Sequence, residues 1–170
     1  MVGKKDKVST WGKVWRFVLC VVVPLVVGGI SAALTMGAMS KFGEMKQPPL
    51  APPAWLFPVA WTILYVLMGV ASWFVWMKGM RGGKKEKTFA KKWLFIYGLQ
   101  LVFNFCWSPM FFNFQWYWFA FGWLIVMWLM IIALIVMARK YSMPAMWMLI
   151  PYVLWCTFAA YLNAGIAVLN

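Results

Sequence analysis

Five apolar runs, each long enough to cross a lipid bilayer, constrain this chain more than any other feature. A helix needs about 20 apolar residues to span the ~30 Å hydrocarbon layer. A soluble domain of 170 residues could not bury a composition that is 65% hydrophobic with 14 Trp. The sequence therefore predicts an all-α membrane protein, a five-transmembrane-helix bundle in a single membrane domain, 1–170. The predicted spans are residues 14–37, 54–77, 93–113, 116–138 and 143–168.

The cations lie between these runs and predict the orientation of the helices. With five spans, all 16 Lys and Arg except Lys41 and Lys46 fall on one side, with the N-terminus and a basic loop, 78–92. Because cytoplasmic loops are enriched in Lys and Arg, we expect a cytoplasmic N-terminus and an external C-terminus. This pattern suits a bacterial plasma membrane, with an organelle outer membrane as the alternative. The same placement of the cations argues against nucleic acid as a partner.

A proline-rich segment precedes the second run, with Pro48, Pro49, Pro52 and Pro53 inside six residues. Proline lacks an N–H and biases the residue before it away from the helical region. We therefore expect a stiff, non-helical lid over residues 38–53, on the external side. Because it leads into a helix with aromatic residues at helical spacing, we interpret the lid as the mouth of a binding site.

Several kinds of chemistry are disfavoured by what the runs lack. No acid lies inside any run and the chain has no His, whereas general acid–base catalysis usually needs one or the other. Proton-coupled transporters likewise place ionisable groups at mid-membrane. The three cysteines, Cys20, Cys106 and Cys156, lie in different runs without metal-ligand spacing. The sequence predicts no metal site and no required cofactor.

Three runs carry aromatic and amide side chains at helical spacing, which places each set on one helix face. Such aromatics also favour membrane interfaces, so a lipid-facing role is the alternative for any single Trp. The amides of Gln100 and Asn104 need partners, either on another helix or in a ligand. The three sets are Trp61, Tyr65, Met68 and Ser72; Gln100, Asn104, Trp107 and Phe111; and Tyr152, Trp155, Ala159 and Leu162.

Small residues mark where helices can approach closely. One small face is expected in the first run and another late in the fifth, and they serve either packing within one chain or a homodimer. The two faces are Gly29, Ala33 and Gly37, and Ala159, Ala160, Ala164 and Gly165.

Three motifs carry a resemblance to a known family. They are Pro48-Pro49-Leu50-Ala51-Pro52-Pro53 with Phe57, Trp61, Leu64-Tyr65 and Met68-Gly69; Gln100-Leu101, Asn104, Trp107-Ser108-Pro109 and Phe111-Phe112; and Pro151-Tyr152, Leu154-Trp155, Phe158-Ala159 and Tyr161-Leu162-Asn163. Together they resemble the tryptophan-rich sensory protein/translocator protein family, also called the peripheral-type benzodiazepine receptor family. The resemblance covers about residues 14–170.

The resemblance implies a five-helix bundle, often a homodimer, that binds porphyrins such as protoporphyrin IX. Some members also bind cholesterol or synthetic benzodiazepine-type ligands. It further implies that Trp61 and Trp155 match two tryptophans implicated in light-dependent porphyrin breakdown. We include Phe42, which stands in the lid where relatives commonly have Tyr. The ligand-binding residues expected from the match are Phe42, Pro52, Trp61, Tyr65, Asn104, Trp107, Trp155, Ala159 and Leu162.

These observations lead to one main functional hypothesis and two alternatives. The main hypothesis is a membrane-embedded binding and sensory protein for tetrapyrroles, with the porphyrin as ligand and membrane lipid as the other partner. Lys41 and Lys46, the only cations on the lid side, would pair with the porphyrin carboxylates at the rim, or are simply solvated. The alternatives are a light- and oxygen-dependent porphyrin-degrading enzyme that uses Trp61 and Trp155, and a transporter of porphyrin, lipid or sterol.

Overall fold

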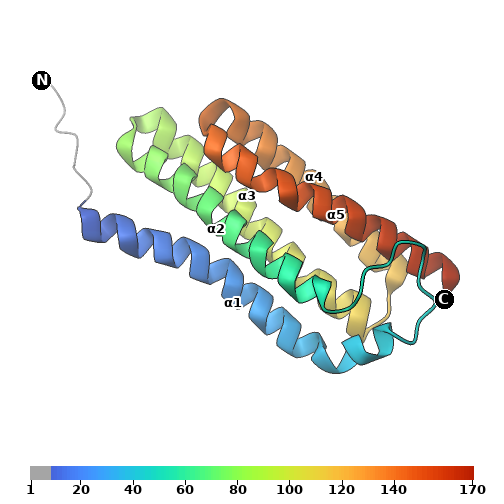
Figure 1. The fold of residues 1–170 in the computed structure, drawn as a ribbon. Helices are drawn as coiled ribbons and strands as arrows, with labels where there is room; N and C mark the ends of the chain where they lie inside the picture. The colour runs from blue at the N-terminus through green and yellow to red at the C-terminus, as the bar shows by residue number, and fades with distance from the viewer. Residues whose placement is uncertain (1–8) are drawn as a thin grey trace, which may run out of the picture.

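The structure, a computed structural model, describes residues 9–170, except for the side chains of residues 39–41. Five helices in this part of the chain are long and apolar enough to cross a membrane, which confirms the predicted all-α fold. A π-helical turn, η1, continues α3 (Figure 1). The elements are α1 (Thr10–Phe42), α2 (Leu56–Arg81), α3 (Lys84–Ser108), η1 (Pro109–Asn113), α4 (Tyr117–Tyr141) and α5 (Met143–Leu169).

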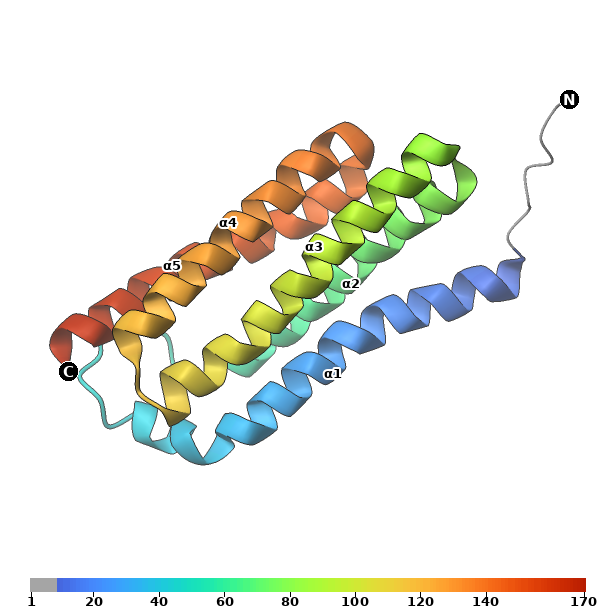
Figure 2. The same cartoon turned by 180° about the vertical axis from the view of Figure 1, so that it is seen from behind.

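Four of the helices form a closed ring and the fifth lies outside it. Helices α2, α3, α4 and α5 each contact two neighbours in the ring, whereas α1 packs mainly against α2, α3 and η1 (Figures 1 and 2). The α1–α2 crossing needs Gly69, because a Cβ there would lie 2.6 Å from the Cys20 carbonyl oxygen and 2.7 Å from the Val21 Cα. A glycine therefore lets the two backbones meet.

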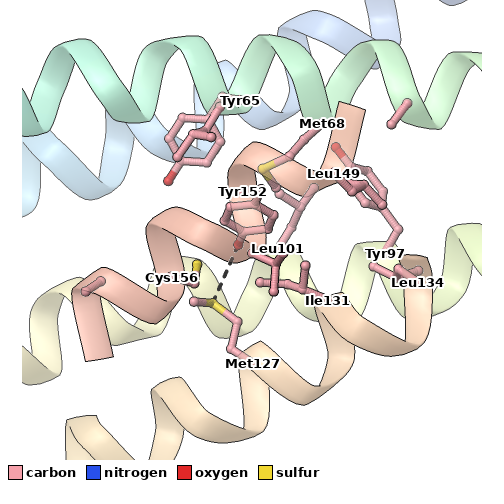
Figure 3. Packing of buried hydrophobic residues seen from close by; sticks show 14 of the residues in the cluster. Tyr65, Met68, Tyr97, Leu101, Met127, Ile131, Leu134, Leu149, Tyr152 and Cys156 are labelled. Carbon is pink, nitrogen blue, oxygen red and sulfur yellow. Dashed lines mark hydrogen bonds between the residues drawn. The ribbon is translucent and has the colours of Figure 1, made fainter. Parts of the chain in front are cut away.

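The interior of the ring is filled by large side chains. Trp93 and Tyr152 are fully buried, and the Trp93 indole N–H donates to the Leu134 carbonyl at 3.0 Å. Figure 3 shows Met68, Leu101, Met127, Ile131 and Leu149 around Tyr152, from all four helices of the ring. Side chains from all four helices therefore fill the middle of the ring.

The prediction that residues 78–92 form a basic loop is wrong. Residues up to Arg81 belong to α2, residues from Lys84 belong to α3, and only Gly82 and Gly83 lie between the helices. Lys and Glu are good helix formers, so the polar segment extends both helices beyond their apolar parts. Hydropathy alone finds only the apolar parts.

The lid is shorter than expected, because residues 38–42 continue α1. From here on, the lid means residues 43–55. The proline segment inside it is non-helical, as expected. Leu50, at the tip, has φ of 65°, a left-handed conformation that costs a non-glycine residue roughly 1–2 kcal/mol.

The small face expected on α1 is not the face through which this helix packs on α2. Gly29, Ala33 and Gly37 are exposed, and a Cβ added to either glycine would meet no atom within 4 Å. Helix α1 packs instead through Gly28, where a Cβ would collide with the Tyr65 ring. The packing face of α1 therefore contains Gly28 instead of the expected Gly29. The homodimer stays a prediction.

Candidate functional site

A buried polar network joins three helices at the centre of the bundle. The Tyr65 hydroxyl of α2 donates to the Asn104 side-chain oxygen of α3 at 2.6 Å. The Asn104 amide donates to the Tyr152 hydroxyl of α5 at 2.8 Å, and the Gln100 amide donates to the same hydroxyl. Tyr152 also points to the Met127 sulfur, 3.7 Å away (Figure 3). Both amides of α3 therefore form helix–helix hydrogen bonds.

Trp61 lies on the lid side of this network and connects it to a cluster of aromatic rings. Its ring centroid is 5.6 Å from Tyr65, 6.2 Å from Tyr152 and 6.5 Å from Trp107. These separations are those at which aromatic pairs attract each other. Trp107 continues the cluster by stacking on Phe111 at 5.3 Å. A flat aromatic ligand would find matching ring faces here.

A cavity of about 90 Å³ opens beside Trp61, between α1, α2 and α3, and we call it the α1 cavity. Its walls are mainly aromatic, with two buried hydroxyl residues on α1. Ser31 and Thr35 use these hydroxyls for hydrogen bonds to backbone carbonyls. The lining residues are Gly28, Ser31, Ala32, Thr35, Phe57, Pro58, Trp61, Tyr65, Trp107, Ser108 and Phe112.

A smaller cavity of about 20 Å³, the lid cavity, lies between the lid end of α3 and α5. It shares Phe57, Trp107 and Phe112 with the α1 cavity, so three aromatic side chains separate the two spaces. The lining residues are Phe42, Phe57, Trp107, Phe111, Phe112, Ala159, Leu162, Asn163 and Ile166.

Phe42, the last residue of α1, closes the lid cavity. Its side chain is only 5% exposed and lies 5.7 Å from both Phe57 and Phe112, between ring centroids. The Gln47 amide donates to the Phe42 carbonyl, which ties the start of the lid to the end of α1. The side chain of Phe42 therefore packs into the interior at the lid end of the bundle.

The lid is fastened to the end of α5. The Asn170 side chain accepts from the Lys46 backbone N–H and donates to the Lys46 carbonyl, both at 3.1 Å. The Tyr161 hydroxyl donates to the Pro49 carbonyl at 2.6 Å. Pro48 sits on Gly165, where a Cβ would approach its ring to 2.6 Å. These contacts hold the lid over the bundle end (Figure 1).

The structure brings together most of the residues expected to bind ligand. Trp61 and Tyr65 line the α1 cavity, and Trp107 lines both cavities. Phe42, Ala159 and Leu162 line the lid cavity only. Asn104 lies behind Tyr65, to which it is hydrogen-bonded.

Trp155 and Pro52 line neither of these two cavities, although the Trp155 ring lies 6.1 Å from Phe57, between ring centroids. Trp155 lines an outer groove on the surface between α2 and α5, together with Leu64, Leu154 and Phe158. Its indole N–H is buried and has no hydrogen-bond partner among the described residues. Pro52 is half-buried in the lid and lines none of these spaces. The two tryptophans expected to act together, Trp61 and Trp155, therefore line different spaces.

The two expected rim cations give no support for a carboxylate site. Lys46 is exposed, and its backbone rather than its ammonium is held by Asn170. The Lys41 side chain lies outside the described residues. Their pairing with a ligand stays a prediction.

The sequence reasoning missed Phe57, Phe112 and Asn163 as site residues. The Trp107 indole donates to the Asn163 side-chain oxygen at 3.2 Å, and the Asn163 amide donates to the Tyr117 carbonyl at 2.8 Å. Asn163 is an amide in an apolar run, so the signal that singled out Gln100 and Asn104 would also have found it. Phe57 and Phe112 stand in the motifs quoted above, but helical spacing alone does not separate them from lipid-facing Phe.

Comparison with known proteins gives consistent similarities along most of the chain. A model of the TspO/MBR family matches residues 20–169. The tryptophan-rich protein TspO of Chlorobaculum tepidum is 30% identical over 153 residues, which cover 89% of this chain and 94% of the relative. The translocator protein of Ovis aries is 35% identical over 122 residues, which cover 72% of this chain and 70% of the relative. Protein CrtK of Rhodobacter capsulatus is 31% identical over 145 residues, which cover 84% of this chain and 85% of the relative.

Proposed function

This chain belongs to the TspO/MBR family of integral membrane proteins, and from that premise we propose that it binds a tetrapyrrole of the protoporphyrin IX type. The binding site is the aromatic interior at the lid end of the bundle. The observation that carries the proposal is the pair of neighbouring cavities that share Phe57, Trp107 and Phe112 as walls. Movement of these rings would join the two spaces into one aromatic pocket.

The size of the cavities requires the site to open. Pockets for drug-sized ligands are about 300–1,000 Å³, whereas these cavities hold about 90 and 20 Å³. Phe42 lines the lid cavity and ends the helix that leads into the lid, so its displacement would enlarge the site. We therefore propose that ligand entry displaces Phe42 and the lid together.

Several neutral polar groups at the site suit a tetrapyrrole. The hydroxyls of Ser31 and Thr35 lie in the α1 cavity, and the Asn163 amide lies in the lid cavity. They can exchange their present backbone or side-chain partners for pyrrole nitrogens or a carboxylate. Stacking on Trp61 and Trp107 supplies about 0.5–1.5 kcal/mol for each aromatic pair beyond area burial. The chain has no His to ligate an iron, so we propose the metal-free macrocycle.

The test is a titration of the purified protein with protoporphyrin IX, followed by quenching of tryptophan fluorescence. Trp107→Leu removes a wall common to both cavities and should raise the Kd about tenfold, equivalent to ~1.4 kcal/mol. Trp118→Leu is the matched control, because Trp118 is 61% exposed at the start of α4. A Kd unchanged in Trp107→Leu but raised in Trp155→Leu would move the site to the outer groove.

One observation favours the enzymatic alternative, in which bound porphyrin is degraded with light and oxygen. Trp61 is in ring contact with three further oxidisable side chains, Tyr65, Trp107 and Tyr152. Illumination of the complex should then bleach the porphyrin absorbance faster with wild type than with Trp61→Phe. A rate equal to that of free porphyrin in both proteins would leave binding as the function.

A further inference from the structure

A further cavity, at the opposite end of the bundle from the lid, combines cations with apolar walls. It holds about 250 Å³ between the last two turns of α2 and the junction of α4 and α5. The lining residues are Trp73, Phe74, Met77, Lys78, Arg81 and Ser142. We propose that this cavity binds one anionic phospholipid, with the phosphate on Lys78 and Arg81 and an acyl chain along Trp73 and Phe74.

Lys78 is held in place as a cation that faces this space. Its ammonium donates to the carbonyl of Tyr141, the last residue of α4, and lies 4.9 Å from the centroid of the Tyr141 ring. The Tyr141 hydroxyl in turn donates to the Glu86 carbonyl at 3.0 Å, and its ring stacks on Phe89 at 4.1 Å. An ammonium has three donors, so two remain for a phosphate.

Arg81 and Ser142 add donors that have no competing partner. Neither Lys78 nor Arg81 forms an ion pair with a described side chain, so neither charge is neutralised within that part of the chain. Ser142 separates α4 from α5, and its hydroxyl caps neither helix. The side chain of Glu86, the one acid at this end among the described residues, folds over Gly82 and Gly83 instead of lining the cavity.

The depth of the cavity favours a lipid over a free phosphate ion. Trp73 and Arg81 are eight residues apart on α2, which is about 12 Å along the helix axis. The cavity therefore extends from the basic helix end into the apolar part of the span. Trp73 lines the apolar part of this space together with Phe74 and Met77. A phosphate ion would leave the Trp73, Phe74 and Met77 walls without a partner.

The chain offers a matched control for the cations. Arg139 and Lys140 lie at the same end of the bundle, at the end of α4, and are exposed without lining the cavity. Lys78→Gln/Arg81→Gln and Arg139→Gln/Lys140→Gln remove the same charge. General attraction of an anionic membrane to a basic surface would weaken equally in both double variants.

The experiment compares the full-length protein in detergent micelles doped with phosphatidylglycerol or with phosphatidylcholine of the same acyl chains. Native mass spectrometry measures lipid retained per protein. Each cation near an anionic surface contributes about 1 kcal/mol, so the preference of wild type for phosphatidylglycerol should fall roughly 30-fold in Lys78→Gln/Arg81→Gln. It should change less than about twofold in Arg139→Gln/Lys140→Gln. Arg81→Gln alone, which leaves the Lys78 contact with α4 intact, should lose about fivefold.

Three results would overturn the proposal. Equal losses in the two double variants would reduce the effect to general surface charge. Equal retention of the two lipids by wild type would remove the headgroup preference. Displacement of phosphatidylglycerol by millimolar inorganic phosphate would assign the site to the free ion.

Discussion

Tyr152→Phe tests the polar network that holds the centre of the bundle. The Tyr152 hydroxyl accepts hydrogen bonds from Gln100 and Asn104, and these two side chains are 0% and 2% exposed. Removal of the hydroxyl leaves two buried amide donors without their shared acceptor. Interhelical hydrogen bonds in membranes contribute ~0.6 kcal/mol on average and up to about 1.7 kcal/mol. The expected loss of unfolding free energy is therefore about 1–3 kcal/mol.

Two companion variants make this prediction specific. Tyr65→Phe removes one hydrogen bond, to Asn104, and should lose about half as much as Tyr152→Phe. The Tyr97 hydroxyl is buried and has no hydrogen-bond partner among the described residues. Tyr97→Phe should therefore leave the stability equal to that of wild type or raise it, since an unpaired buried polar group is removed.

The assay is equilibrium unfolding in mixed micelles of increasing dodecyl sulfate content, followed by tryptophan fluorescence. The order of stability should be Tyr97→Phe at or above wild type, then Tyr65→Phe, then Tyr152→Phe. The reasoning is refuted if Tyr152→Phe lies within ~0.5 kcal/mol of wild type. It is equally refuted if all three variants lose the same amount.

Three further predictions concern helix packing, the lid and orientation. Gly69→Ala should lower the free energy of unfolding by about 1–3 kcal/mol, because the added Cβ would meet the α1 backbone. Gly98→Ala, where an added Cβ meets no atom within 4 Å, should leave it unchanged. Equal unfolding curves for the two variants would contradict this. Gly165→Val should push Pro48 and the lid away from α5, and so raise the rate constant for protoporphyrin IX association in stopped-flow fluorescence quenching. Gly122→Val, where an added Cβ meets no atom within 4 Å, is the control. An unchanged rate constant in Gly165→Val would show that the lid does not limit entry. A reporter fused to the N-terminus should be cytoplasmic in a bacterial host, since all but two of the 16 Lys and Arg lie on that side; external reporter activity would reverse the topology.

The sequence predicts the helices well because bilayer thickness sets their number and approximate length. It fails for residues 78–92, since Lys-rich segments outside the membrane still form helix. It also misplaces the packing face of α1 by one residue, at Gly29 instead of Gly28. A membrane helix is apolar on every side, so periodicity does not show which side faces a neighbour.

The candidate site was predictable where polar residues interrupt an apolar run, and less so elsewhere. Asn104 and Tyr65 are hydrogen-bonded to each other. Trp155 follows the same spacing rule but lines the outer groove, because the rotation of α5 about its axis is fixed by packing that one sequence does not reveal. The closure of the interior by Phe42 depends on how far α1 continues into the predicted lid, and helix ends are the least certain part of such a prediction.

A structure of the protein bound to protoporphyrin IX tests the proposed function most directly. Our account predicts the macrocycle in the joined α1 and lid cavities, stacked against Trp107 and Trp61, with Phe42 moved out of the interior and the lid released from Asn170. A macrocycle in the outer groove beside Trp155, with Phe42 still inserted between Phe57 and Phe112, would contradict it.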